Sequence, residues 1–319
     1  MKREDVAKKA LALHKKLGGK ISTGLPMKVK DKSDLSLIYT PGVAAVSTYV
    51  AKNPGQARDY TIKGKMVAVI SDGSAVLGLG NIGPLGALPV MEGKCALFKT
   101  FANVDAFPIV LDTQNVDEIV ETICHIAPGF GGINLEDFAA PHCFEVEEKL
   151  KARLDIPVMH DDQHGTAIVV TAGLMNAAKV VKKKFESLRV VVVGAGAAGT
   201  AITKLLLKAG VRDIIVLDSK GVIVRGREKL SSYKEELADV TNPRGVSGEL
   251  RDALRKADAV VGVSGPNLIS ESDIRMMAPG PVVFALANPV PEISPEAALK
   301  AGALVVATAA GASPKQARP

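Results

Sequence analysis

Two acidic pairs, Glu136-Asp137 and Asp161-Asp162, are the clearest candidates for chemistry in this chain. Carboxylates without cysteine or histidine in a suitable grouping indicate a site for a hard cation, Mg²⁺ or Mn²⁺, rather than for zinc. Both pairs precede a glycine motif at residues 194–199 that is typical of dinucleotide-binding loops. A divalent cation beside a nicotinamide suits a reaction in which a hydride leaves and a carbonyl must then be polarised.

The glycine motif at residues 194–199 gains its meaning from its context. Four valines at 190–193 form an apolar strand that leads directly into Gly194, and the next residues open a helix whose N–H groups can face a pyrophosphate. A further strand ends at Asp218, where a carboxylate can hold the hydroxyls of the adenosine ribose. The predicted cofactor-binding residues are Gly194, Ala195, Gly196, Ala197, Ala198, Gly199 and Asp218.

The choice between the two nicotinamide cofactors stays open at this point. Asp218 favours NAD, because a carboxylate accepts hydrogen bonds from a free ribose and repels a 2′-phosphate. Lys220, Arg225 and Arg227 lie close enough in sequence to accommodate NADP.

Residues 78–83 also match the G-x-G-x-x-G pattern, but the context is poorer. Ser71-Asp72-Gly73 separates Gly78 from the preceding strand, and Pro84-Leu85-Gly86 makes a poor continuing helix. We therefore expect a tight, glycine-rich active-site loop here rather than a second dinucleotide site.

The bulk composition indicates a globular protein of two domains rather than a nucleic-acid-binding or membrane protein. The chain has 319 residues, 47% of them hydrophobic, and a net charge of +6. Its lysines are scattered without interleaved aromatic residues, which argues against a nucleic-acid partner. The uncharged stretch 73–91 contains five glycines and two prolines, so we expect no membrane helix. Three cysteines without paired spacing, and an N-terminus without an apolar leader, predict reduced thiols in a cytoplasmic protein.

Hydrophobic periodicity predicts an α/β protein whose second half is a doubly wound parallel sheet of the Rossmann type. The expected domains are residues 1–163, which bind substrate and metal, and residues 164–319, which bind NAD(P). We expect strands at 66–70, 106–111, 156–159, 189–193, 214–217, 259–263 and 282–286. We expect helices at 4–17, 116–126, 138–154, 165–185, 197–209 and 249–257. Residues 37–43 look like a strand broken at Pro41-Gly42, which places Tyr39 at a strand edge.

Six segments together resemble the malic enzymes, in the order in which that family has them. They are YTPGVA at 39–44, SDGSAVLGLGNIG at 71–83, PVMEGK at 89–94, FGGINLED at 130–137, HDDQHGTA at 160–167 and FALANP at 284–289. The resemblance covers residues 20–308, almost the whole chain. It implies oxidative decarboxylation of (S)-malate to pyruvate and CO₂, with NAD or NADP as hydride acceptor and Mg²⁺ or Mn²⁺ as metal. It also suggests a homodimer.

The resemblance assigns roles to individual residues. Glu136, Asp137 and Asp162 match the family's metal ligands. Lys94 matches the general base and contacts substrate, and Tyr39 matches the general acid. Two further matches complete the set: Asp161, a carboxylate beside the lysine that does not ligate the metal, and Asn288, a residue at the substrate and nicotinamide.

The end of the sequence departs from the family pattern. Residues 309–319 read AAGASPKQARP where the family has GRSDYP followed by a pair of asparagines. The resemblance implies that one of those asparagines helps to hold the substrate, so the altered end could impair turnover. Two alternatives accompany the main hypothesis. The chain could be a dehydrogenase of another 2-hydroxy acid, or a protein that binds NAD(P) and metal with impaired turnover.

Overall fold

A computed structural model describes residues 3–76 and 79–309 of the chain. It divides into two compact units, Met1–Phe138 with Glu145–Met159, and Ala139–Phe144 with His160–Pro319. The division into functional domains at residue 163 stays a prediction, because packing alone does not say which residues bind substrate or cofactor. The atypical stretch at the end of the chain lies outside the described residues from position 310 onward.

Short helices occupy the first part of the N-terminal unit. Their bounds are α1 Arg3–Leu17, α2 Lys32–Ile38, α3 Gly42–Lys52, η1 Pro54–Gln56, α4 Ala57–Tyr60 and η2 Ile62–Gly64. The strand expected at 37–43 is wrong, since this stretch joins two helices. The helix signal was present at Asp31, whose carboxylate caps α2 by accepting from the backbone N–H groups of Ser33 and Asp34.

A four-stranded sheet forms the core of the N-terminal unit, with the strand order β2-β1-β3-β4. The strands are β1 Met66–Ser71, β2 Asp105–Val110, β3 Gly132–Leu135 and β4 Val158–His160. β1 is central and pairs in parallel with both β2 and β3. The helices after β1, β2 and β3 are α5 Gly83–Ala102, α6 Val116–Ile126 with η3 Ala127–Gly129, and α7 His142–Arg153. This alternation of strand and helix is what a parallel sheet requires.

Helix α5 corrects a second expectation. It begins at Gly83 and runs through Pro84 and Gly86 for 20 residues. The proline lies in the first turn, where its missing N–H has no partner to lose, so it favours the helix start. Val69 of β1 packs with Met91 and Cys95 of this helix. Of the motif at 78–83, Gly78 lies outside the described residues.

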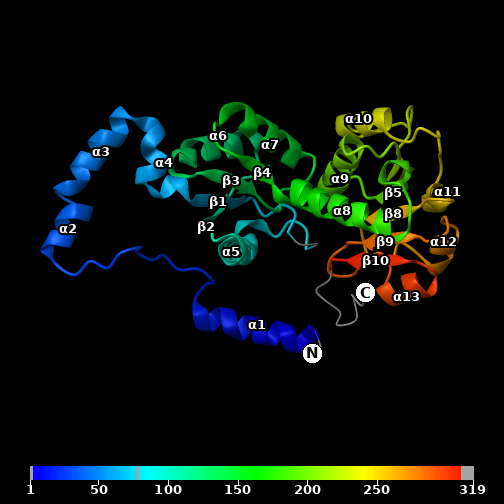
Figure 1. Ribbon diagram of the computed structural model, residues 1–319, viewed down its shortest axis with the longest axis horizontal. Coiled ribbons are helices and arrows are strands. Elements are labelled where there is room, and N and C mark those ends of the chain that lie inside the picture. The colour runs from blue at the N-terminus through cyan, green and yellow to red at the C-terminus, as the bar shows by residue number, and fades with distance from the viewer. Residues whose placement is uncertain (1–2, 77–78, 310–319) are drawn as a thin grey trace. The chain divides into compact units, whose positions relative to one another are not determined.

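The C-terminal unit contains a six-stranded sheet with the order β10-β9-β8-β5-β6-β7 (Figure 1). The strands are β5 Arg189–Val193, β6 Asp213–Asp218, β7 Gly221–Val222, β8 Ala259–Gly262, β9 Val282–Ala285 and β10 Val305–Thr308. All neighbouring pairs are parallel except β6 with β7. The chain leaves β5 toward β6 on one side and later returns to β8 on the other. This reversal between β5 and β8 is the topological switch point at which doubly wound folds bind ligands.

Helices cover both faces of this sheet (Figure 1). Their bounds are α8 Asp161–Val180, η4 Phe185–Ser187, α9 Ala197–Lys208, α10 Ser232–Val240, α11 Leu250–Leu254, α12 Glu271–Arg275 and α13 Pro295–Lys300. Val190 and Val192 pack toward α8, α9 and α10, whereas Val191 and Val193 pack toward α11, α12 and α13. The four consecutive valines are therefore explained by a strand that is buried on both faces.

Candidate active site

Two candidate carboxylates follow strand β3 directly, and both are buried. Glu136 is 4% exposed and Asp137 is 2% exposed. The backbone fixes them, because Glu136 N–H donates to Ile70 O at 2.9 Å and Ala75 N–H donates to Asp137 O at 2.9 Å. Asp137 has a φ of 58°, in the left-handed region that non-glycine residues seldom adopt. A buried acid in that conformation is typical of a functional position.

Lys94 lies on α5 and reaches this carboxylate pair. Its Nζ is 2.9 Å from Glu136 Oε1, and its side chain is 21% exposed. The other carboxylate oxygen, Glu136 Oε2, accepts from Asn134 Nδ2 at 2.9 Å. Asn134 was not predicted from the sequence. The available signal was its position two residues before Glu136, because side chains two residues apart along a strand point to the same face of the sheet.

The second acidic pair follows strand β4. Helix α8 begins at Asp161, so Asp161 and Asp162 form its first turn and His160 is the N-cap. The helix start expected at 165 is therefore four residues late, and the helix ends at Val180 instead of 185. His160 is buried, with Nε2 3.4 Å from Asp162 Oδ2. A carboxylate in a first helical turn is stabilised by the positive end of the helix dipole.

Glu136, Asp137 and Asp162 come together at neighbouring strand ends. Each offers a carboxylate oxygen, and these oxygens lie within 4.8 Å of one another. The sheet explains this, since β3 and β4 are adjacent strands. Three carboxylates concentrated in this way repel one another unless a cation neutralises them. An all-oxygen donor set fits Mg²⁺ or Mn²⁺ and does not fit zinc.

Tyr39 is placed differently from the other candidate catalytic residues. It is the C-cap of α2 and 66% exposed. Among the described residues, no side-chain hydrogen bond is formed by its hydroxyl. The role of Tyr39 as general acid stays a prediction.

The loop from β5 to α9 has the geometry that a pyrophosphate needs. Gly194 has a φ of 116°, and a Cβ there would lie 2.6 Å from Val263 O. A Cβ on Gly199 would lie 1.7 Å from Gly194 O, so only glycine permits this close turn. Gly196 is the N-cap of α9, and a Cβ there would meet nothing within 4 Å. The first and third glycines thus serve packing, and the second faces open space.

The other residues predicted around this loop occupy the expected places. Ala195 is buried between Gly194 and Gly196, and Ala197 and Ala198 form the first turn of α9. Their backbone N–H groups stand at the positive end of the helix, where a phosphate is stabilised.

Asp218 ends β6, as expected, but its carboxylate is already engaged. Oδ2 accepts from Arg227 Nη2 at 2.5 Å and from Lys234 Nζ at 2.7 Å, and Oδ1 accepts from Lys220 N–H at 2.9 Å. Burial raises the pKa of Asp218, but these hydrogen bonds outweigh it and lower the pKa to about 2. Lys234 was not predicted, because a lysine 16 positions further along a polar stretch carries no distinctive signal.

Asn288 lies in the loop that follows β9 and is exposed. The carboxyl ends of β5, β8 and β9 are adjacent in the sheet, so this loop belongs to the same edge as the glycine loop. Its proximity to a nicotinamide stays a prediction.

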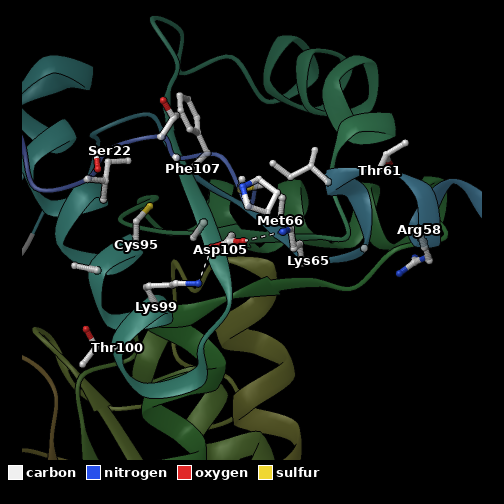
Figure 2. Close-up of a pocket in the computed structure, with 18 of the residues that line it drawn as sticks. Ser22, Arg58, Thr61, Lys65, Met66, Cys95, Lys99, Thr100, Asp105 and Phe107 are labelled. Atoms are coloured by element: carbon white, nitrogen blue, oxygen red, sulfur yellow. Dashed lines mark hydrogen bonds and ion pairs between the residues drawn. The ribbon is translucent and has the colours of Figure 1, made fainter. Parts of the chain in front are cut away.

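A separate cavity of about 1050 Å³ lies in the N-terminal unit, along the edge strand β2 (Figure 2). Figure 2 shows Lys65 and Lys99 both reaching Asp105, at 3.9 and 2.9 Å. Cys95 contributes to the wall, and burial raises the pKa of its thiol to about 12, so it is not a reactive thiolate. Among the described residues, the lining includes none of the predicted catalytic or metal-binding side chains.

The fold and the site define a dinucleotide-binding α/β protein with a carboxylate cluster suited to a divalent cation. The chain belongs to the malic enzyme family. Residues 19–116 and 113–151 match the malic enzyme N-terminal domain, and residues 163–317 match the malic enzyme NAD binding domain.

Several malic enzymes are similar to the chain over most of its length. An NAD-dependent malic enzyme of Geobacillus stearothermophilus is 54% identical over 92% of this chain and 61% of its own length. A bifunctional malic/malolactic enzyme of Bacillus subtilis is 53% identical over 96% of this chain and 75% of its own. The crystal structure of an NAD-dependent malic enzyme from Thermotoga maritima superimposes with a TM-score of 0.92 at 51% identity, covering 95% of this chain and 81% of that one.

The chain spans about three fifths of the length of the Geobacillus relative. Its three cysteines are free thiols. Within the described part of the chain, no helix combines the length and the apolar character that a membrane crossing requires.

Proposed function

We propose that this chain catalyses the oxidative decarboxylation of (S)-malate to pyruvate and CO₂, with NAD(P)⁺ as hydride acceptor. The observation that carries the proposal is the group of three carboxylates, Glu136, Asp137 and Asp162, with the Lys94 ammonium 2.9 Å from one of them. A dinucleotide fingerprint on the same chain supplies the other half of the reaction.

Glu136, Asp137 and Asp162 would hold the divalent cation, Mg²⁺ or Mn²⁺. When bound, it would polarise the C2 oxygen of the substrate, and NAD(P)⁺ would accept the hydride from C2. Asp161 starts the same helical turn as Asp162 and would adjust the charge around Lys94 without ligating the metal.

Lys94 and Tyr39 would move the protons. As its neutral amine, Lys94 Nζ would take the proton of the C2 hydroxyl as the hydride leaves, and the resulting keto acid would lose CO₂ to give the enolate of pyruvate. Tyr39 then gives its phenolic proton to C3. Removing one acid or base of this kind typically costs about 10²–10⁴-fold in rate. Asn288 would orient the substrate against the nicotinamide.

We propose that both NAD and NADP are accepted at the adenosine ribose. Asp218 offers a carboxylate to the ribose hydroxyls, which supports NAD. The two cations bonded to it, Arg227 and Lys234, are 18% and 23% exposed against 8% for Asp218. A 2′-phosphate would therefore find positive charge as accessible as the acid, which supports NADP.

We further propose a cytoplasmic homodimer. Helices α2, α3 and α4 contain no buried residue. Leu37 is 70% exposed, and Leu35, Val46 and Tyr49 are exposed as well. A run of apolar side chains of this kind on a soluble domain is typical of a protein interface, and a second copy is the occupant that the family resemblance suggests. Sedimentation of the wild type and of Leu37→Ser tests this: a wild-type monomer would contradict it.

The decisive assay is malate-dependent reduction of NAD⁺ and of NADP⁺, with and without Mn²⁺. We expect reduction of both cofactors that requires the metal, and little reduction with lactate or tartrate. A metal-supplemented protein that binds NADH but forms none from malate would reject the proposed activity. Faster turnover with lactate or tartrate would reassign the substrate.

A further inference from the structure

One buried carboxylate, Glu292, has no part in the mechanism above. It lies in the loop after β9 and is 0% exposed. Its Oε1 accepts from Ser264 N–H at 2.9 Å, and its Oε2 accepts from Ala287 N–H at 3.1 Å. A fully buried carboxylate is costly unless hydrogen bonds compensate it, so its presence calls for a reason.

The two partners of Glu292 belong to different loops at one edge of the sheet. Ser264 lies in the loop after β8, and Ala287 precedes Asn288 in the loop after β9. The backbone of Glu292 adds a third tie, because its carbonyl accepts from Ile269 N–H at 3.1 Å. The side chain thus joins the segment that carries Asn288 to the neighbouring loop.

The loop after β8 in turn supports the dinucleotide fingerprint. Gly194 packs on it so closely that a Cβ would lie 2.6 Å from Val263 O and 3.2 Å from Ser264 Cβ. Val263 N–H donates to Val193 O at 2.9 Å, which continues the pairing of β8 with β5 past the strand end. A shift of Ser264 would therefore displace the backbone at Gly194.

The chain makes room for this carboxylate at Gly262. A Cβ at Gly262 would lie 2.4 Å from Glu292 Cδ and 2.7 Å from Oε1. The φ of Gly262 is not in the left-handed region, so the close approach of Glu292, and not backbone conformation, is what requires glycine here. β8 therefore ends in a glycine because a side chain from another loop occupies the space.

We propose that Glu292 is a positioning residue for the active site, which holds the Asn288 loop and the β8 loop in register with the glycine fingerprint. This inference rests on the proposed function for its kinetic part, and on the fingerprint alone for its binding part. Glu292 would act without contacting substrate or cofactor. It acts by fixing two backbone N–H groups with one rigid acceptor pair, which pre-organises the segments on either side of the nicotinamide.

The test compares Glu292→Gln with a control variant at the N-terminal end of β8. That end lies opposite the β8 loop that Glu292 contacts. Glutamine keeps the shape but turns one acceptor into a donor, which faces a backbone N–H. Asp258 precedes β8, and its Oδ2 likewise accepts a backbone N–H, from Arg189 at 2.8 Å. Asp258→Asn therefore disturbs the same sheet away from the proposed site.

For Glu292→Gln we expect kcat/KM for malate to fall about 10- to 100-fold, since misplacement on the ångström scale costs up to about 10² in rate. NADH affinity, measured by calorimetry without malate, should fall several-fold. Asp258→Asn should lower the melting temperature and leave both quantities within about twofold. If Glu292→Gln does not fold, Gly262→Ala displaces the same carboxylate and should shift the same two quantities.

Unchanged kinetics and NADH affinity in folded Glu292→Gln would overturn the proposal. Equal losses in Asp258→Asn would also overturn it, since the effect would then follow stability alone. A wild type that binds NADH without oxidising malate would reject the proposed function, and the calorimetric comparison would still decide whether Glu292 positions the cofactor loops.

Discussion

The two sheets of this protein differ in the residues that lie at the carboxyl ends of their strands. The four-stranded sheet ends in charged side chains, with buried Glu136 and Asp137 and the Lys94 ammonium beside them. In the six-stranded sheet, β5 leads into Gly194 and β8 ends at Gly262, and the loop after β5 offers backbone N–H groups and open space at Gly196. A dication needs concentrated negative charge, whereas a pyrophosphate needs close approach to a helix N-terminus. The carboxyl end of a parallel strand therefore suits a divalent cation where it carries acidic side chains. It suits a pyrophosphate where glycines leave the backbone accessible.

The largest loss of activity is expected for Asp162→Asn, in the group of three carboxylates. One carboxylate is removed from a three-acid group, so metal binding and turnover should be lost together, by roughly 10³-fold or more if the cation supplies several kcal/mol. NADH binding at the glycine loop of residues 194–199 should be unaffected. Steady-state rates, Mn²⁺ titration and NADH calorimetry check this in one preparation. An unchanged metal requirement and rate would remove Asp162 from the site.

Lys94→Ala should follow, with a loss of about 10²–10⁴-fold in kcat for malate oxidation. Lys99→Ala, on the same helix and paired with Asp105 outside the site, is the matched control and should retain nearly full activity. Oxaloacetate decarboxylation should also fall in Lys94→Ala. Retention of most activity would refute the assignment of Lys94 as the base.

At the glycine loop, two alanine substitutions should separate packing from ligand approach. Gly199→Ala places a Cβ 1.7 Å from Gly194 O and should destabilise the unit by about 1–3 kcal/mol. Gly196→Ala meets no protein atom, so it should leave the melting temperature nearly unchanged and weaken NADH binding instead. Thermal unfolding and calorimetry distinguish them. Equal melting temperatures for the two variants would contradict the division of roles.

The smallest effect concerns pH. The folded pKa of Asp218 is lowered from its ordinary 3.8 to about 2. The ion-paired acid therefore adds stability above pH 3.8 that is lost as the pH falls through about 2. Asp218→Asn should lower the free energy of unfolding by about 2 kcal/mol at pH 7, and this difference should shrink in acid. Urea melts at pH 7 and pH 3 measure it, and a constant difference would contradict the ion-pair account.

Two segments with clear patterns were predictable from the sequence, whereas the bounds of helix α8, the start of helix α5 and the short run at 37–43 were not. The helix at 116–126 and the strand at 189–193 were confirmed at both ends. Residues 37–43 have the pattern of a strand but lie between two helices, because a short apolar run has no period long enough to tell helix from strand. The sequence does not reveal the start of α5, because a proline is compatible both with a break in a helix and with its first turn.

By itself, the sequence determined the α/β class, the dinucleotide fingerprint and the carboxylates suited to a hard cation, since each depends on residue type and local spacing. Only the tertiary structure decided that Glu136, Asp137 and Asp162 meet, that Lys94 reaches Glu136, and that Asp218 is held by Arg227 and Lys234. It also showed Glu292 joining two loops at one sheet edge. These contacts depend on which strands are neighbours and how side chains fill the space between them, which no local pattern contains.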